Sequence, residues 1–291
     1  MPELPELEIV REVLGRRVLG QTITEVLVVP PGGPIVARDL TGREFGSTLN
    51  GAKIAAVDRR GKFLVFSFEP GPEPLFLAVN PKLTGRLQLA PASEKRLPKT
   101  HLVLSLSGGH QLRYVDQKQM GQLYLTRDLA MVPDYAGLGP EPFDVSLETF
   151  RARLKTFRGE IKGVLTRGEF IAGIGNAYAD EILWAARLHP YRKRTQLTPD
   201  EVDRLYAAMR YTLLRRLLTL LNTSSIIGSW MINVAIATME AKTRIKAYST
   251  EPLLLYLPAG NTSYPAFSPM PPASHPKADT LAQRRRPNFN G

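Results

Sequence analysis

The stretch from residue 21 to residue 127 contains a series of short apolar runs, each bounded by clusters of proline and glycine. Regularly spaced runs of this kind are typical of β-strands and predict a β-sandwich or a β-barrel. Residues 107–110, Ser-Gly-Gly-His, separate two of the runs and predict a hairpin. We expect strands at residues 24–29, 63–68, 75–79, 101–106, 111–115 and 122–125.

Helical periodicity precedes and follows these strands. Residues 6–18 place apolar side chains on one helical face, and further helical patterns begin near residues 146, 161 and 198. Residues 138–142, Leu-Gly-Pro-Glu-Pro, form a break where the strand pattern ends. We therefore expect an α+β multidomain fold. It comprises an N-terminal β-sandwich at 1–130 that carries the first helix, a linker at 131–145, a helical domain at 146–221 and a C-terminal segment at 222–291.

The composition is basic and free of cysteine. The 291-residue chain has 38 lysines and arginines against 27 aspartates and glutamates, a net charge of +11. This favours a polyanionic partner such as a nucleic acid, although ribosomal and membrane-surface proteins share it. Without cysteine, disulfides and thiolate metal sites are excluded, and the scattered histidines lack ligand spacing. No run reaches the roughly 18–20 apolar residues of a membrane span and no leader opens the chain, so we expect a soluble cytoplasmic protein.

The chain opens with the sequence M-P-E-L-P-E, which contains candidate catalytic groups. Removal of Met1 would leave Pro2 with a free secondary amine. An α-amino group titrates at roughly 7.7–8, so near neutral pH much of it is unprotonated and able to attack an electrophilic carbon. Glu3 is adjacent and Glu6 lies one helical turn further on, so both carboxylates can move protons for the amine. Taken alone, such a start is also typical of a solvated, fraying terminus.

A glycine-rich turn at residues 173–176, Gly-Ile-Gly-Asn, precedes another helical pattern. The turn lets the backbone approach a ligand closely and delivers Asn176 to the N-terminus of that helix. There, a side-chain amide and free backbone N–H groups can hold a phosphate. A lone G-x-G is also common as a simple helix cap.

Two motifs together resemble the formamidopyrimidine-DNA glycosylase and endonuclease VIII family, enzymes that excise oxidised bases from DNA. They are the opening P-E-L-P-E and G-I-G-N-x-Y-A-x-E, which lies within residues 161–190. The resemblance covers residues 1–220, and the 161–190 segment is similar to the family's helix–two-turn–helix DNA-binding motif. It implies that the helical domain at 146–221 carries this motif, and that the partner is double-stranded DNA containing oxidised bases or abasic sites, bound by a monomer.

The resemblance also implies a mechanism. The chain would be a bifunctional DNA glycosylase and abasic-site lyase of base excision repair, in which the Pro2 amine attacks C1′ of the damaged nucleotide. Glu3 would protonate the sugar oxygen or assist ring opening, and Glu6 would help to fix the amine. β- and δ-elimination from the iminium would then cut the strand, with no metal or organic cofactor required.

Further site residues follow from the resemblance. The R-x-G-K turn at 59–62, by composition a basic surface turn, would bring Lys62 into the active site as a fourth catalytic residue beside Pro2, Glu3 and Glu6. There it would contact the DNA backbone near the lesion. Residues 80–85 correspond to the family's H-x-G-M-S-G loop, which puts Leu83 in the place of the methionine that fills the gap left by an extruded base. Lys162 and Asn176 would bind phosphates at the lesion. Tyr178 and Glu181 would support the site, although Glu181 is equally consistent with a solvated or structural ion pair.

Residues 114–121 match the family's Y-x-D-x-R-x-F-G motif with differences that leave the opposite-base preference open. Lys118 and Met120 replace the arginine and the phenylalanine that pair with and stack beside the orphaned base, and Gln119 between them can also reach the gap. Lysine lacks the planar fork of arginine, and methionine is a flexible apolar wedge. From the residues alone, Leu83 and Met120 are equally consistent with ordinary core packing.

The resemblance ends near residue 221. The family normally ends in a zinc finger built on two C-x-x-C pairs, and this chain has no cysteine. Arg285 is the best candidate for the finger's DNA-contacting arginine, and a flexible basic tail is the alternative.

Two other functions compete with the glycosylase prediction. One is a non-catalytic damaged-DNA-binding relative, and the retained Pro2, Glu3 and Lys62 argue against it. The other is an unrelated basic nucleic-acid-binding protein, which leaves the two motifs unexplained.

Overall fold

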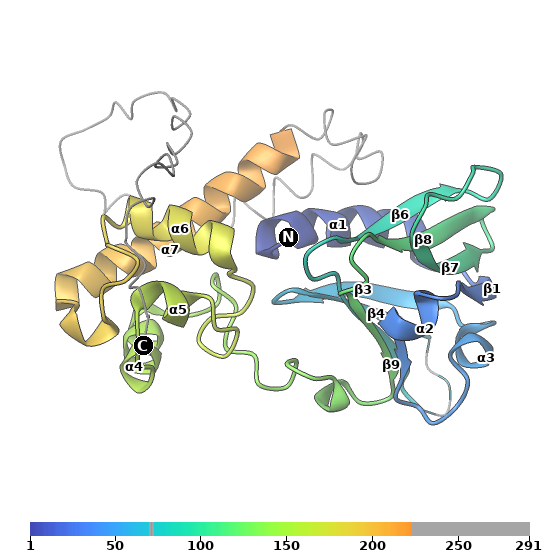
Figure 1. The fold of residues 1–291 in the computed structure, drawn as a ribbon, viewed down its shortest axis with the longest axis horizontal. Helices are drawn as coiled ribbons and strands as arrows, with labels where there is room; N and C mark the ends of the chain where they lie inside the picture. Colours follow the sequence, from blue (N-terminus) through green and yellow to red (C-terminus); the bar gives the residue numbers. More distant parts are fainter. Residues whose placement is uncertain (70, 72, 223–291) are drawn as a thin grey trace, which may run out of the picture. The chain divides into compact units, whose positions relative to one another are not determined.

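Two β-sheets occupy residues 23–126 of the computed structural model, which describes residues 1–69, 71 and 73–222 (Figure 1). The first sheet has the strand order β1-β7-β8-β6 and the second has the order β2-β9-β5-β4-β3. Neighbouring strands run antiparallel, except β2 and β9, which pair in parallel. The strands are β1 (Ile23–Val28), β2 (Ala37–Asp39), β3 (Ile54–Arg60), β4 (Phe63–Phe68), β5 (Phe76–Asn80), β6 (Gly85–Pro91), β7 (Thr100–Leu106), β8 (His110–Asp116) and β9 (Gln122–Thr126).

One apolar core joins the inner faces of the two sheets. Alternate residues of β7, such as Leu102 and Leu104, belong to the same buried cluster as Leu64 and Phe66 of β4. Side chains two residues apart lie on one face of a strand, so each sheet contributes one apolar face. The expected β-sandwich is therefore present.

The six expected strands are all present, with each end within one residue of its expected place. The hairpin at 107–110 is confirmed, because β7 and β8 pair antiparallel and Gly109 has φ +76°. Strands β2, β3 and β6 were not expected. Strands β2 and β3 contain alanine and aspartate, and β6 contains glycine, alanine and proline. These residues have weak strand propensity, so pairing with β9, β4 and β8 determines the conformation of the three strands.

The first helix links the sandwich to the helical region. α1 (Leu4–Val18) directs Leu7 and Leu14 into the core of the sandwich, while Ile9 and Val13 pack against Leu214 and neighbouring leucines of α7. The other helices are α2 (Gly33–Val36), α3 (Phe45–Leu49), α4 (Leu147–Thr156), α5 (Ile161–Leu165), α6 (Asn176–Ala185) and α7 (Pro199–Asn222), with 3₁₀ turns at Leu129–Met131 and Arg194–Gln196.

The helical region contains the helices expected from the sequence. Ser146 caps α4 by accepting a hydrogen bond from the Thr149 N–H, and α7 supplies buried residues to a core shared with α4, α5 and α6. No helix in the described part of the chain is long and apolar enough to cross a membrane. Of the C-terminal segment at 222–291, the structure describes only Asn222, so Arg285 lies outside the described residues. The domain boundaries at 130 and 145 stay predictions.

Candidate active site

The carboxylate of Glu3 caps helix α6 from the other end of the described chain. It accepts hydrogen bonds from the backbone N–H groups of Gly175 (2.6 Å), Ala177 (3.1 Å) and Tyr178 (3.4 Å). The residue before α6 is a glycine without a capping side chain, so Glu3 satisfies donors that the helix start leaves open. Glu3 is 2% exposed, which excludes a fraying terminus at this residue.

The G-I-G spacing of residues 173–175 makes this contact possible. A Cβ atom on Gly175 would lie 2.4 Å from Glu3 Oε1, and one on Gly173, which has φ +89°, would lie 2.9 Å from Leu4 Cβ. The Gly173 carbonyl accepts from the Leu4 N–H at 3.1 Å. The N–H groups of residues 175, 177 and 178 therefore hold Glu3, whereas the sequence suggested that free N–H groups here would hold a phosphate. Asn176 is exposed at the first position of the helix.

Glu6 connects the terminus to two helices. Its Oε2 accepts from the Glu3 N–H at 3.1 Å, and its Oε1 accepts from the Tyr178 hydroxyl at 2.5 Å. Burial and the adjacent Glu6 raise the pKa of Tyr178, so this hydroxyl remains a donor. Arg216 of α7 lies with Nε 3.6 Å from Glu6 Oε1 and also faces the charge of Glu181, which is itself exposed. Arg216 lies on the polar side of an amphipathic helix, so no sequence signal marked it.

Lys62 lies in the β3–β4 turn and faces the charge of Glu3. Burial lowers the pKa of Lys62, an effect that Glu3 opposes and Lys82 reinforces. Burial raises the pKa of Glu3, although the N–H groups of α6 and the charge of Lys62 oppose it. A buried acid and a half-buried amine thus face each other, and desolvation favours the neutral form of each.

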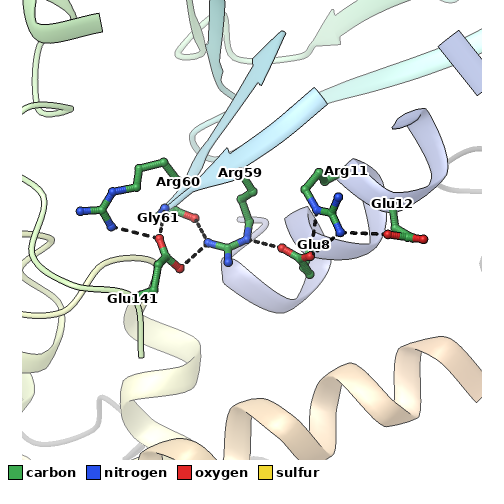
Figure 2. A network of polar contacts seen from close by, with 7 residues as sticks. All are labelled: Glu8, Arg11, Glu12, Arg59, Arg60, Gly61 and Glu141. Carbon is green, nitrogen blue, oxygen red and sulfur yellow. Dashed lines mark hydrogen bonds and ion pairs between the residues drawn. The ribbon is translucent and has the colours of Figure 1, made fainter. Parts of the chain in front are cut away.

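A network of polar contacts fixes the turn that carries Lys62 (Figure 2). Arg59 donates to Glu8 of α1 (Nε to Oε2, 2.7 Å) and to Glu141 (Nη1 to Oε2, 2.7 Å). Glu141 Oε1 also accepts from the Gly61 N–H at 2.7 Å and from Arg60 Nη1 at 3.1 Å. The Arg59 side chain is only 9% exposed, so the basic turn is not a solvated surface feature.

The Pro/Gly break at 138–142 is bound into the same assembly. Arg60 Nη2 donates to the carbonyl oxygens of Leu138 (3.0 Å) and Gly139 (2.7 Å). The Ala172 N–H donates to the Pro140 carbonyl at 3.0 Å, and a Cβ on Gly61 would lie 3.3 Å from Ala172. Sequence reasoning missed Glu8 and Glu141, although Glu141 lies within the Leu-Gly-Pro-Glu-Pro break.

The side chains expected to fill a DNA gap lie on two loops and are exposed. Leu83 is 41% exposed and Met120 is 52% exposed, which rules out ordinary core packing for both. Lys118 is exposed and Gln119 is half-buried. The carboxylate of Asp116, which sequence reasoning did not single out, accepts hydrogen bonds from residues of both loops.

Lys162 lies apart from the contacts around Glu3 and is not free. Its Nζ lies 2.7 Å from Oδ1 of Asp180 on α6. A phosphate would have to compete with Asp180 for this ammonium group. Within the described residues, no group of three or more histidines, aspartates and glutamates is arranged to hold a metal ion, and the chain has no cysteine for a zinc finger.

Comparisons with known proteins agree with this architecture. The sequence profile of the formamidopyrimidine-DNA glycosylase N-terminal domain matches residues 1–123, and that of the formamidopyrimidine-DNA glycosylase H2TH domain matches residues 138–225. The chain is 37% identical over 219 residues to the formamidopyrimidine-DNA glycosylase of Symbiobacterium thermophilum, covering 74% of this chain and 70% of that one. It is 40% identical over 220 residues to the Heliobacterium modesticaldum enzyme of the same name, covering 73% and 77%.

Solved structures give the same result. The fold is similar to Lactococcus lactis Fpg in a complex with DNA that contains an abasic site, with a TM-score of 0.66, 31% identity and coverage of 74% of this chain and 78% of that one. The MutM (Fpg) protein from Thermus thermophilus gives a TM-score of 0.65 at 35% identity, with coverage of 75% and 76%. With both family domains matched and the buried Glu3 joining the terminus to the second of them, the chain belongs to the formamidopyrimidine-DNA glycosylase family of DNA repair enzymes.

Proposed function

We propose that this protein is a bifunctional DNA glycosylase and abasic-site lyase of base excision repair. Its substrate is double-stranded DNA containing an oxidised base or an abasic site, and it acts as a monomer on the DNA of the bacterial nucleoid. The observation that carries the proposal is the buried Glu3 carboxylate, held by three backbone N–H groups beside Pro2 and facing Lys62.

The chemistry starts once Met1 has been removed. The nitrogen of Pro2 forms a bond to C1′ of the damaged nucleotide and the glycosidic bond breaks. The base leaves with the bonding electron pair and gains a proton, and the Pro2 nitrogen loses its proton. Protonation of the ring oxygen opens the sugar and leaves an iminium between Pro2 and C1′. Loss of a C2′ proton then expels the 3′ phosphate by β-elimination, and δ-elimination expels the 5′ phosphate. The covalent intermediate divides one difficult displacement into easier steps.

Glu3 is the group that supplies the proton to the ring oxygen. Burial raises its pKa, which increases the fraction of protonated carboxyl near neutral pH. The contact with α6 holds this carboxyl one residue from the nucleophile. Glu6, through the Glu3 N–H and the Tyr178 hydroxyl, keeps the first turn of α1 in register with α6.

Basic residues and one amide side chain bind the DNA backbone in this proposal. Lys62, Lys162 and Asn176 contact phosphates near the lesion, and the net charge of +11 makes affinity strongly dependent on salt. The exposed Leu83 fills the space of the extruded nucleotide, and Lys118, Gln119 and Met120 contact the base left opposite it.

The test is borohydride trapping on a duplex that contains an abasic site. The processed protein is expected to form a covalent adduct, and Pro2→Gly and a form that retains Met1 are expected to form none. Mass spectrometry of the N-terminus verifies that Met1 has been removed. An N-terminally processed protein that binds the duplex without forming an adduct would refute the lyase mechanism and identify a non-catalytic damaged-DNA-binding relative.

A further inference from the structure

The carboxylate of Asp116 joins the loop that carries Leu83 to the loop that carries residues 118–120. Asp116 ends β8 opposite Gly85, the first residue of β6, and is fully buried (0% exposed). Its Oδ1 accepts from the Thr84 hydroxyl on the first loop and from the Lys118 N–H on the second, at 3.2 Å. The Lys118 N–H also lies 3.0 Å from Thr84 Oγ1. Thr84 and Asp116 therefore form a direct link between the two loops.

The second carboxylate oxygen completes the link. Oδ2 of Asp116 accepts from the Gly121 N–H at 2.8 Å and from the Tyr114 hydroxyl at 3.4 Å. A Cβ atom added to Gly121 would lie 1.6 Å from the Tyr114 hydroxyl oxygen, and one added to Gly85 would lie 2.1 Å from it. The backbone of both loops therefore packs directly against this hydroxyl. Burial alone would raise the pKa of Asp116, but hydrogen bonds led by those from Thr84 and Gly121 hold it below its ordinary value.

Each loop contains a residue in a conformation that needs such support. Lys82, next to Leu83, has φ +49°, and Gln119, between Lys118 and Met120, has φ +55°. Residues other than glycine rarely adopt this left-handed region of backbone conformation. They remain in it where surrounding contacts hold the backbone. Leu83 and Met120, at the tips of the two loops, are exposed. Thr84 and Gly121, where the loops meet the sheet, donate hydrogen bonds to the one buried carboxylate of Asp116.

We propose that Asp116 is a positioning residue that holds Leu83 and the 118–120 loop at a fixed separation, so that filling of the gap and contact with the opposite base occur together. The proposal rests on the proposed function, because it takes Leu83 to fill the gap at a lesion in duplex DNA and residues 118–120 to contact the base opposite. Without the link, each loop would engage the DNA independently.

Thr84→Val tests the link, because it removes one hydroxyl while keeping the size and shape of the side chain. Thr84→Ser restores the hydroxyl and is expected to restore the behaviour of the unaltered protein. Thr24→Val, on the exposed side of β1, is the matched control. The probe is a set of duplexes that carry a tetrahydrofuran abasic-site analogue opposite each of the four bases, and the measured quantity is Kd.

A double-mutant cycle of Leu83→Ala and Met120→Ala measures the coupling between the loops. In the unaltered protein we expect the two effects on Kd to be non-additive by about tenfold, which is 1.4 kcal/mol. In Thr84→Val we expect them to multiply independently, and the ratio of Kd values between the preferred and the other opposite bases to fall by a similar factor. The thermal midpoint of each variant is also recorded, so that a loss of stability is identified. Such a loss by itself would not change a ratio of Kd values.

Independent effects in the unaltered protein, or a coupling that Thr84→Val leaves intact, would overturn the proposal. The measurement requires binding but no chemistry. A protein that shows the coupling and yet forms no borohydride-trapped adduct would refute the proposed activity while supporting the role of Asp116. A protein that binds none of the duplexes would overturn both.

Discussion

Replacing Gly175 by alanine would place a methyl group 2.4 Å from Oε1 and 2.5 Å from Cδ of Glu3. The φ of Gly175 is −117°, which alanine adopts freely, so the backbone does not oppose the change. The carboxylate must instead move away from the start of α6. It would lose the 2.6 Å bond from the Gly175 N–H and weaken those from residues 177 and 178.

The magnitude follows from these bonds. A hydrogen bond to a charged group contributes about 1.5–3 kcal/mol net. If displacement of the carboxyl removes the free energy of one such hydrogen bond from the stabilisation of the transition state, the rate falls about 10- to 150-fold. The assay is the single-turnover rate of borohydride trapping on an abasic duplex, with Kd for the same duplex measured in parallel.

Two comparisons isolate the cause. Gly15→Ala is the matched control, since a Cβ at this position in α1 meets nothing within 4 Å, and we expect the trapping rate to be unchanged. In a Glu3→Gln background, Gly175→Ala should have little further effect, because both changes act on one contact. Trapping by Gly175→Ala at the unaltered rate, or a full additional loss in the Glu3→Gln background, would refute the assignment of Glu3 as the group that the turn positions.

Three further outcomes are expected. Because folding raises the pKa of Glu3, its contribution to stability is present below the unfolded value of 4.5 and is lost as pH rises through the folded pKa. The unfolding free energy of Glu3→Gln, measured with urea, should therefore rise relative to that of the unaltered protein as the pH increases from acidic to neutral. A difference between the two proteins that stays constant with pH would contradict this. Glu141→Ala leaves the buried Arg59 and the Gly61 N–H without a shared acceptor and should lower the unfolding free energy by about 3 kcal/mol, whereas the exposed Glu44→Ala should change it little; equal small losses would show that the network in Figure 2 is not stabilising. Lys162→Ala should reduce the slope of log K against log salt by about one and weaken binding equally for all opposite bases, and an unchanged slope would leave Lys162 paired only with Asp180.

Sequence patterns located the elements whose own residues determine them. Short apolar runs bounded by proline and glycine identified six strands, and the Ser146 and Thr198 caps identified the starts of α4 and α7. Strands β2, β3 and β6 were not predicted, because each contains residues of weak strand propensity and becomes a strand through pairing with a neighbour.

The candidate site divides in the same way. The residues themselves indicated Glu3, Glu6 and the glycine turn, and the resemblance to the family added Tyr178, since all of these lie in short contiguous motifs. It did not identify the contacts among them. Residue 3 caps a helix that begins at residue 176, a separation that no local pattern encodes.

The sequence by itself determined the fold class, the family and the residue types available for catalysis, because periodicity and motif spacing are local properties of the chain. Only the tertiary structure decided that the N–H groups of α6 hold Glu3, that Glu141 and Arg59 fix the turn of Lys62, and that Asp116 joins two loops. Each of these contacts joins residues far apart in the chain whose geometry depends on how the sandwich, α1 and α7 pack, and buried polar groups accept partners from wherever packing brings them.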